Sequence, residues 1–252
     1  MIESITAPNP GPFTLDGTRS YIIDGVAVID PGPVIDSHLD AILRKAPRLE
    51  SILVTHRHGD HAPGAVALRE RTGARVYAPA ESLQPAAIDH ALQDGDHIVA
   101  GSLTLEAIAT PGHTAEHFCF LGSGGELFTG DTILGEGTTV IFPPDGHMGS
   151  YLASLEKLLG RNPARIYPGH GPTRDDATLW IRWYIEHRRE RENQILETLR
   201  GGPASVSSLR RAVYPELDPR LERAAELQLR AHLTHLEEEG AVRQERKLWA
   251  RA

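Results

Sequence analysis

The sequence predicts an α/β fold over most of its length and a helical unit behind it. Short β-rich runs alternate with helical patterns up to residue 174, and such alternation is typical of sheets covered by helices. Several of these runs stop at a glycine that stands beside a histidine or an aspartate. From Asp175 onward the pattern becomes predominantly helical.

The elements of the α/β part follow from periodicity and from turn residues. A strand over 26–29 ends at Asp30-Pro31-Gly32, and a helical pattern over 35–45 comes after it. The run 103–109 alternates as a half-buried strand does. Further strands are expected over 51–54, 75–77, 118–121, 126–129 and 165–167, and further helices over 65–72 and 151–159.

The C-terminal part reads as helices followed by a hairpin. A long helix is expected over 177–199, where apolar residues such as Trp180 and Trp183 recur among charges before Gly201-Gly202-Pro203 stops the pattern. Helices over 206–214 and 220–239 follow, and then a short run through Trp249. Helix, helix and hairpin in that order indicate a winged-helix-like unit. The predicted division is 1–174, a connecting helix over 175–200, and 201–252.

The densest group of chemically active side chains follows the strand expected over 51–54. It is the run Thr55-His56-Arg57-His58-Gly59-Asp60-His61. Neutral imidazole is a ligand for zinc, iron and other transition ions, and a carboxylate supplies charge for a second ion. Such a concentration of ligand-type residues is hard to explain as an exposed loop, so the sequence predicts a metal site here.

Three more ligand-type residues follow other expected strands. His113 comes after Thr110-Pro111-Gly112, Asp131 comes after Gly130, and His170 comes after Pro168-Gly169. Any one of these residues alone would more often be a turn, surface or core residue. Repetition of the same pattern favours one shared site.

In this order and context, the residues resemble the metallo-β-lactamase superfamily. The segments 9–18, 130–140, 167–172 and 187–192 are also similar to those of the β-lactamase-like protein 2 group, over nearly the whole chain. The resemblance implies an αββα sandwich with a small C-terminal winged-helix-like domain, and both metals at one edge of the sheets. It assigns the first metal to His56, His58 and His113, and the second to Asp60, His61 and His170. Asp131 and a hydroxide would bridge the two.

The expected activity is hydrolysis by that hydroxide, with Asp60 and Asp131 as the catalytic carboxylates. Two divalent ions close together lower the pKa of a shared water and polarise the oxygen of a carbonyl or phosphoryl group. Zinc is the expected metal, with manganese and iron as alternatives. Candidate helpers beside the ligands are Thr55, Thr114 and Thr132, for each of which packing or capping is the simpler role.

Three functions compete at this stage. The first is endonucleolytic cleavage of single-stranded RNA, as described for a member of the resembling group. The second is hydrolysis of a small ester or thioester, as in glyoxalase II. The third is a metal-binding interaction protein without turnover, with the tail serving partner docking or a homodimer. The formal net charge of −8 and an aromatic content of 6%, which predicts few stacking partners for bases, weigh against RNA.

For several other residues, a structural or solvent-exposed role is expected, and a functional role is the alternative. Cys119 is expected to be a core thiol, and His117 a structural residue at the start of a strand. The loop 141–149 is expected to face solvent; the alternative is that it borders the substrate cleft, with His147 and Tyr151 as the residues to test. His232 and His235 are expected to be structural, because no third ligand has a reason to join them. The tail cations are expected to be solvated rather than phosphate-binding; they are Arg210, Arg211, Arg243, Arg246 and Lys247.

The N-terminal residues show no basic start followed by an apolar run, and no stretch is long enough to span a membrane. We therefore expect a cytoplasmic protein without a membrane partner.

Overall fold

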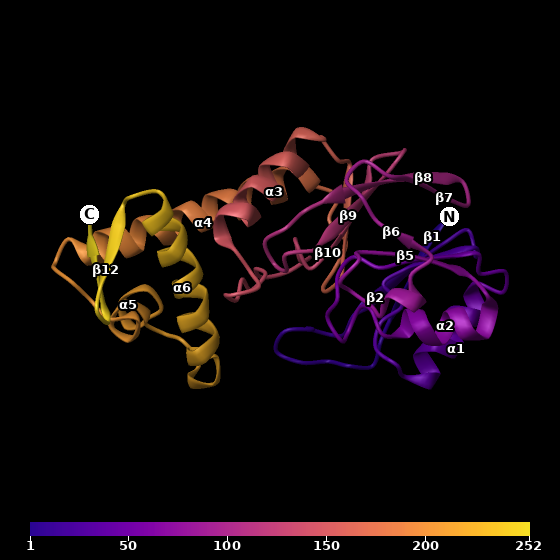
Figure 1. The fold of residues 1–252 in the computed structure, drawn as a ribbon, viewed down its shortest axis with the longest axis horizontal. Helices are drawn as coiled ribbons and strands as arrows, with labels where there is room; N and C mark the ends of the chain where they lie inside the picture. The colour runs from indigo at the N-terminus through magenta and orange to yellow at the C-terminus, as the bar shows by residue number, and fades with distance from the viewer.

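The computed structural model describes residues 1–252, and the part up to residue 168 contains two mixed sheets (Figure 1). The first has strand order β1-β2-β3-β4-β5-β6, with antiparallel pairs from β1 to β3 and parallel pairs from β3 to β6. Its strands are β1 (Ile2–Thr6), β2 (Arg19–Ile23), β3 (Ala27–Ile29), β4 (Ser51–Leu53), β5 (Arg75–Ala78) and β6 (His90–Ala91).

The second sheet has strand order β11-β10-β9-β8-β7. Its pairs are antiparallel except β10 with β11, which run parallel. Its strands are β7 (His97–Ala100), β8 (Leu103–Ala109), β9 (Phe118–Gly122), β10 (Glu126–Gly130) and β11 (Arg165–Pro168).

Helices cover the outer face of each sheet. Helices α1 (Asp36–Lys45) and α2 (Gly64–Thr72) share an apolar cluster with the first sheet, and α3 (Met148–Gly160) and α4 (Ala177–Leu199) share one with the second. A third cluster fills the space between the sheets, where Ile29 and Leu53 meet Phe120 and Phe128. The layers are therefore helix, sheet, sheet, helix, which confirms the predicted sandwich.

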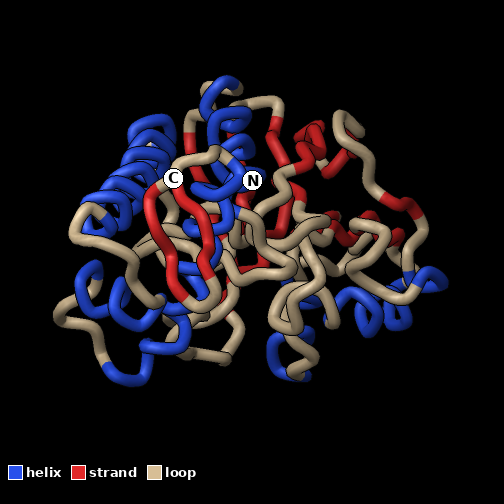
Figure 2. The backbone as a smooth tube through the Cα atoms, turned by 60° about the vertical axis from the view of Figure 1, so that its left-hand side comes forward, coloured by secondary structure: helices blue, strands red, loops and turns tan.

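The C-terminal unit contains α5 (Val206–Val213), a 3₁₀ turn η2 (Pro219–Leu221), α6 (Glu222–Glu238) and the hairpin of β12 (Val242–Glu245) and β13 (Leu248–Arg251). It has its own core, to which the end of α4 contributes Ile195 and Leu199. In Figure 2 the hairpin lies beside the C-terminus, with helices around it. None of the helices combines the length and the apolar character that crossing a bilayer requires.

Most predicted elements are present, with three differences. The sequence interpretation did not identify β1, β2, β6 and β7. The helix expected over 151–159 begins earlier, because the ring of His147 accepts a hydrogen bond from the N–H of Ser150 and caps it. The helix expected over 220–239 begins as η2, where Asp218 caps the turn and proline occupies its first position. The boundaries of the three-part division stay a prediction.

Candidate metal centre

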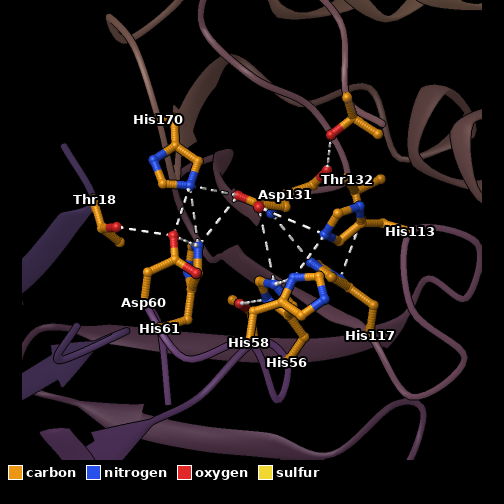
Figure 3. A network of polar contacts seen from close by, with 12 residues as sticks. Thr18, His56, His58, Asp60, His61, His113, His117, Asp131, Thr132 and His170 are labelled. Atoms are coloured by element: carbon orange, nitrogen blue, oxygen red, sulfur yellow. Dashed lines mark hydrogen bonds and ion pairs between the residues drawn. The ribbon is translucent and has the colours of Figure 1, made fainter. Parts of the chain in front are cut away.

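The seven predicted ligands come together at one edge of the sandwich (Figure 3). The loop after β4 carries four of them, and the segments after β8, β10 and β11 carry the others. Close packing at these turns requires glycine. At Gly169 an added Cβ would lie 2.7 Å from His61 Cε1 and 2.8 Å from Asp131 Oδ1, and at Gly112, where φ is +145°, it would lie 2.4 Å from Tyr151 Cα.

The first ligand group is His56, His58 and His113. His58 Nδ1 lies 3.0 Å from His56 Nε2 and 3.0 Å from His113 Nε2. Asp131 Oδ2 completes the group, at 3.5 Å from His113 Nε2 and 3.9 Å from His56 Nε2. Ligands at zinc–nitrogen distance in a tetrahedral site lie about 3.3 Å apart, so this spacing fits one ion.

The second ligand group is Asp60, His61 and His170. His61 Nε2 and His170 Nε2 lie 3.3 Å apart, and Asp60 Oδ2 lies 3.5 Å from the first and 3.2 Å from the second. Asp131 Oδ1 lies 3.3 Å from both imidazole nitrogens. The two oxygens of Asp131 therefore face different groups.

The imidazole nitrogens and carboxylate oxygens of these seven residues are arranged to bind two cations rather than to form hydrogen bonds with one another. Asp131 Oδ1 is buried without a hydrogen-bond partner, which is costly for a carboxylate oxygen unless a cation binds it. Several ring nitrogens also direct lone pairs toward one another at these short distances. Hydrogen-bond partners on the far side of the rings fix that orientation.

Backbone carbonyls fix two of the rings. His113 Nδ1 lies 2.8 Å from the carbonyl oxygen of Val140, and His170 Nδ1 lies 3.3 Å from that of Gly17. A carbonyl can only accept, so Nδ1 carries a proton in both rings and Nε2 is the nitrogen that faces the site.

Asp30 fixes two further rings, and the sequence interpretation missed its role. Its Oδ2 lies 2.8 Å from His61 Nδ1 and accepts a hydrogen bond of 2.8 Å from the Thr55 hydroxyl. The Thr55 oxygen in turn lies 3.0 Å from His56 Nδ1, which must donate because the Thr55 proton is already used. One buried carboxylate thus orients a ligand in each group. The signal that could have revealed it is Asp30-Pro31-Gly32 at a strand end.

The two groups differ in protonation. Burial and neighbouring imidazoles lower the pKa of His56 and of His58. Burial acts in the same direction on His61 and His170, but Asp131 and the other carboxylates outweigh it, raising the pKa of His61 well above its usual value and that of His170 to about 9. Burial raises and the facing imidazoles lower the pKa of Asp60, with a net value of about 2. His56 and His58 are therefore neutral, as a metal ligand must be, whereas His61 and His170 would release a proton when an ion binds.

Residues beside the ligands hold the loops that carry them. His117 is buried, and its Nε2 accepts a hydrogen bond of 3.2 Å from the Asp131 N–H, while the Thr132 hydroxyl lies 3.1 Å from its Nδ1. Glu116 accepts from Arg57 at 2.8 Å and so fastens the loop after β4. Thr18 donates to Asp60 Oδ2 at 3.1 Å. These contacts position ligands, and Thr114, whose buried hydroxyl has no partner, makes none of them.

A cleft of about 810 Å³ opens above the ligands, between the sandwich and the C-terminal unit. His58, Asp60 and Asp131 belong to its lining, and its size is that of a site for a small-molecule substrate. Much of its wall is apolar. These apolar residues include Phe13, Leu15 and Phe142 from the sandwich and Leu217, Leu221 and Ala225 from the C-terminal unit.

The loop 141–149 borders the cleft, but the two residues singled out for testing near it do not line it. Phe142 and Asp145 line the cleft, but His147 and Tyr151 do not. Tyr151 is fully buried and donates to the carbonyl of Thr132 at 2.7 Å, so it is a core residue. His147 lies 2.9 Å from Glu238 on α6 and joins the loop to the C-terminal unit.

A third group joins His232 and His235, contrary to the expectation that none would. Glu192 Oε1 on α4 lies 3.2 Å from His232 Nδ1 and 2.8 Å from His235 Nδ1. The cluster links α4 to α6. Two of the tail cations are held in ion pairs, Arg210 with Glu222 at 3.0 Å and Arg243 with Glu245 at 2.7 Å.

The structure also contains aromatic stacking that the composition did not predict. Trp180 and Trp183 on α4 stack with centroids 4.5 Å apart, and Trp183 stacks on His187 at 5.2 Å. At the other end of the stack, the guanidinium carbon of Arg174 lies 4.1 Å from the centroid of the Trp180 ring. His187, at the inner end of this aromatic column, lines the cleft.

Fold and ligand set together define the αββα class with a potential binuclear metal site, and comparison with known proteins gives the family. Residues 13–170 match the model of the metallo-beta-lactamase superfamily, and residues 205–249 match that of the beta-lactamase associated winged helix domain. The chain therefore belongs to the metallo-beta-lactamase superfamily and carries its associated winged helix.

Individual relatives agree with this assignment. A beta-lactamase-like protein 2 homolog of Caenorhabditis elegans is 37% identical over 79% of this chain and 71% of its own length. An atrochrysone carboxyl ACP thioesterase of Cryptosporiopsis is 31% identical over 77% of this chain and 62% of its own length. A metallo-beta-lactamase family protein of Thermus thermophilus shares the fold with a TM-score of 0.81 at 20% identity, covering 100% of this chain and 98% of that one.

Proposed function

We propose that this protein is a binuclear zinc hydrolase that cleaves the ester or thioester bond of a substrate with an apolar acyl group. The observation that carries this proposal is the cleft directly above the ligands, with its apolar lining and its volume of about 810 Å³. The likeness to a protein named as a thioesterase supports it.

The residues divide the task between binding and orientation. His56, His58 and His113 would hold the first ion, Asp60, His61 and His170 would hold the second, and Asp131, which faces both groups, would be available to either. Bound ions supply Lewis acidity toward a carbonyl oxygen and make hydroxide available near neutral pH. Asp60 stays ionised because its pKa is about 2, so it could accept a hydrogen bond from a water in the site and orient it. The apolar lining excludes bulk water and places the acyl group.

Cleavage of single-stranded RNA is the second candidate, and His187 favours it, because it is the ring of the aromatic column that lines the cleft. An aromatic ring in a cleft can stack on a base, whereas Trp180 and Trp183 already stack on each other, on His187 and on Arg174. The wall of the cleft is mostly apolar, however, and the ion-paired Arg210 and Arg243 leave less free positive charge on the C-terminal unit. The acyl substrate explains more of the lining.

The experiment compares zinc-loaded, manganese-loaded and chelator-treated protein on two substrate sets. One set is a series of N-acetylcysteamine thioesters of increasing acyl length, and the other is labelled single-stranded RNA. We expect metal-dependent thioester cleavage that rises with acyl length and is lost in Asp131→Ala. Asp36→Asn, an exposed carboxylate on α1, is the matched control.

Two outcomes would contradict the proposal. Metal-dependent RNA cleavage without thioester turnover would assign the site to phosphodiesters. Metal binding with no turnover on either substrate set, across all acyl lengths, would favour a metal-binding interaction protein without catalytic activity.

A further inference from the structure

Arg188 on α4 is a buried cation without an acidic partner. Its side chain lines the cleft although the residue is only 2% exposed. One guanidinium nitrogen donates to the carbonyl of Thr139 at 2.6 Å, the group lies 5.3 Å from the Tyr151 ring, and Nε has no partner. A buried charge that meets only neutral groups is costly, which indicates that a counter-ion belongs there.

Arg191 repeats this arrangement one turn further along α4. It also lines the cleft, and it donates to the carbonyl of Val213 at 2.9 Å and to Gln194 Oε1 at 2.7 Å. Its guanidinium lies 4.4 Å from the Tyr214 ring. By contrast, Arg189 between them points to the surface and forms an ion pair of 2.8 Å with Glu156. The two arginines in the cleft therefore lack the acidic partner that their neighbour has.

Gln228 on α6 adds a neutral donor to the same cleft. The residue is 7% exposed, and its Oε1 accepts a hydrogen bond of 2.9 Å from the Ile141 N–H. Its Nε2 is buried without any partner. Because an unpaired buried amide is destabilising, a ligand that accepts from it would remove that cost.

The acidic residues in the lining do not supply the missing partner. Asp145 is held by Arg57 at 2.5 Å, and Asp60 and Asp131 face the imidazoles. Glu136 is exposed in the lining and forms no ion pair with Arg188 or Arg191. Burial and then the charges of Arg188 and Arg191 lower the pKa of His187 to about 4, so this part of the cleft is electropositive while the His187 ring itself stays neutral.

We propose that Arg188, Arg191 and Gln228 form a binding site for an anionic oxygen group of the substrate, a carboxylate or a phosphate, on the wall made by α4 and α6. A planar guanidinium and an amide donor match two or more oxygens of such a group. The proposal rests on the proposed function for the substrate, an acyl compound, and adds a negative charge to it.

The test uses matched thioesters and the metal-loaded enzyme. Glutaryl and adipoyl thioesters of N-acetylcysteamine are each compared with a neutral isostere in which an isopropyl group replaces the carboxylate, and with an analogue that ends in a phosphate ester. We expect the wild type to prefer an anionic member by about tenfold in kcat/KM, and Arg191→Gln and Arg188→Gln to abolish that preference. Glutamine keeps a donor for the carbonyl that each arginine holds.

Arg189→Gln is the control, because it makes the same change on the outer face of the same helix. It should leave the preference unchanged. A wild type without preference, or variants that lose the anionic and neutral substrates equally, would overturn the proposal. If Arg188→Gln does not fold, Arg191→Gln decides alone.

A binding measurement separates this proposal from the proposed function. Glutarate and inorganic phosphate are titrated calorimetrically into metal-loaded wild type, Arg191→Gln and Arg189→Gln. Binding that weakens about tenfold in Arg191→Gln alone, together with no thioester turnover at all, would support the anion site and overturn the hydrolase proposal. Equal binding by all three proteins would overturn the anion site, whatever is hydrolysed.

Discussion

The cleft has two walls that differ in how completely their polar groups are paired. On the sandwich wall, five ligand rings converge, and four of them have a hydrogen-bond partner behind them. On the wall made by α4, α6 and the segment 214–221, apolar side chains alternate with the unpaired donors of Arg188 and Gln228. The rings of the first wall are therefore oriented by the protein itself, whereas the second wall keeps donors without a partner. Under the proposals above, the first wall would supply the reaction and the second would set the selectivity.

The strongest test of this division is loss of the residue that both ligand groups share. Asp131→Ala should lower turnover by about a thousandfold or more, because it removes a ligand from each ion and several kcal/mol of charge stabilisation with it. The fold should persist, since the polar contacts of the Asp131 carboxylate are with the imidazoles of the two groups. Mass spectrometry measures the metal content of the variant, and circular dichroism shows whether its fold persists. Full activity in the variant would refute the two-metal centre.

A smaller effect is expected when only the support behind the ligands is changed. Asp30→Asn should weaken metal binding by about 10- to 100-fold, because Asp30 uses both oxygens as acceptors and an amide has only one. If the amide oxygen keeps the contacts with His61 and the Thr55 hydroxyl, the amide NH2 faces the Thr55 N–H, and two donors then oppose each other. Competition with a chelator dye measures the affinity. Asp36→Asn should match the wild type, and an Asp30→Asn protein with unchanged affinity would mean that the rings are held by packing alone.

A change on the other wall should alter substrate choice and leave the metals in place. Leu221→Ala removes apolar surface from the cleft and should lower kcat/KM for long acyl groups by about tenfold, since a few methylenes in such a pocket contribute about 1–3 kcal/mol. Metal content should stay at the wild-type level. Leu179→Ala, on α4 at a position 67% exposed, is the control. Equal losses for short and long acyl groups would remove Leu221 from the acyl-binding surface.

The smallest effect concerns the cluster that attaches α6 to α4. Burial lowers the pKa of His232, so as the pH falls below about 6.5 the unfolded chain takes up a proton before the folded protein does. Stability should therefore be greatest above that pH and decrease toward pH 5. For Glu192, burial favours the neutral form, but the two histidines outweigh it and lower its pKa, so its contribution is lost only at more acidic pH.

Hydrogen exchange of α6 amides, corrected for the intrinsic rate, measures this loss between pH 7.5 and 5.5. His232→Gln should show a weaker pH dependence over the same interval. A dependence as steep as that of the wild type would place the titrating group elsewhere.

The sequence predicted the sandwich wall far better than the other one. His56, His113 and His170 each stand directly after a short apolar strand, and such local signals can be read along the chain. Asp30 carries the same signal, but the sequence does not reveal that its carboxylate reaches His61, because that contact depends on the pairing of β3 with β4.

The second wall depends on contacts between distant segments. Gln228 meets Ile141 and Glu192 meets His232 through the packing of whole helices, which periodicity does not specify. The aromatic column was different: Trp180, Trp183 and His187 recur at helical spacing, so a local signal was present although the low aromatic content argued against it.

One peptide group connects the two walls. The carbonyl of Val140 accepts from the metal-site ring of His113, and the N–H of the same amide, belonging to Ile141, donates to Gln228. Hydrogen bonds in series polarise one another, so donation to Gln228 makes the carbonyl a stronger acceptor and the His113 ring a more electron-rich ligand. If a substrate binds Gln228 as proposed, this single amide would connect that contact to His113 without any movement of the C-terminal unit.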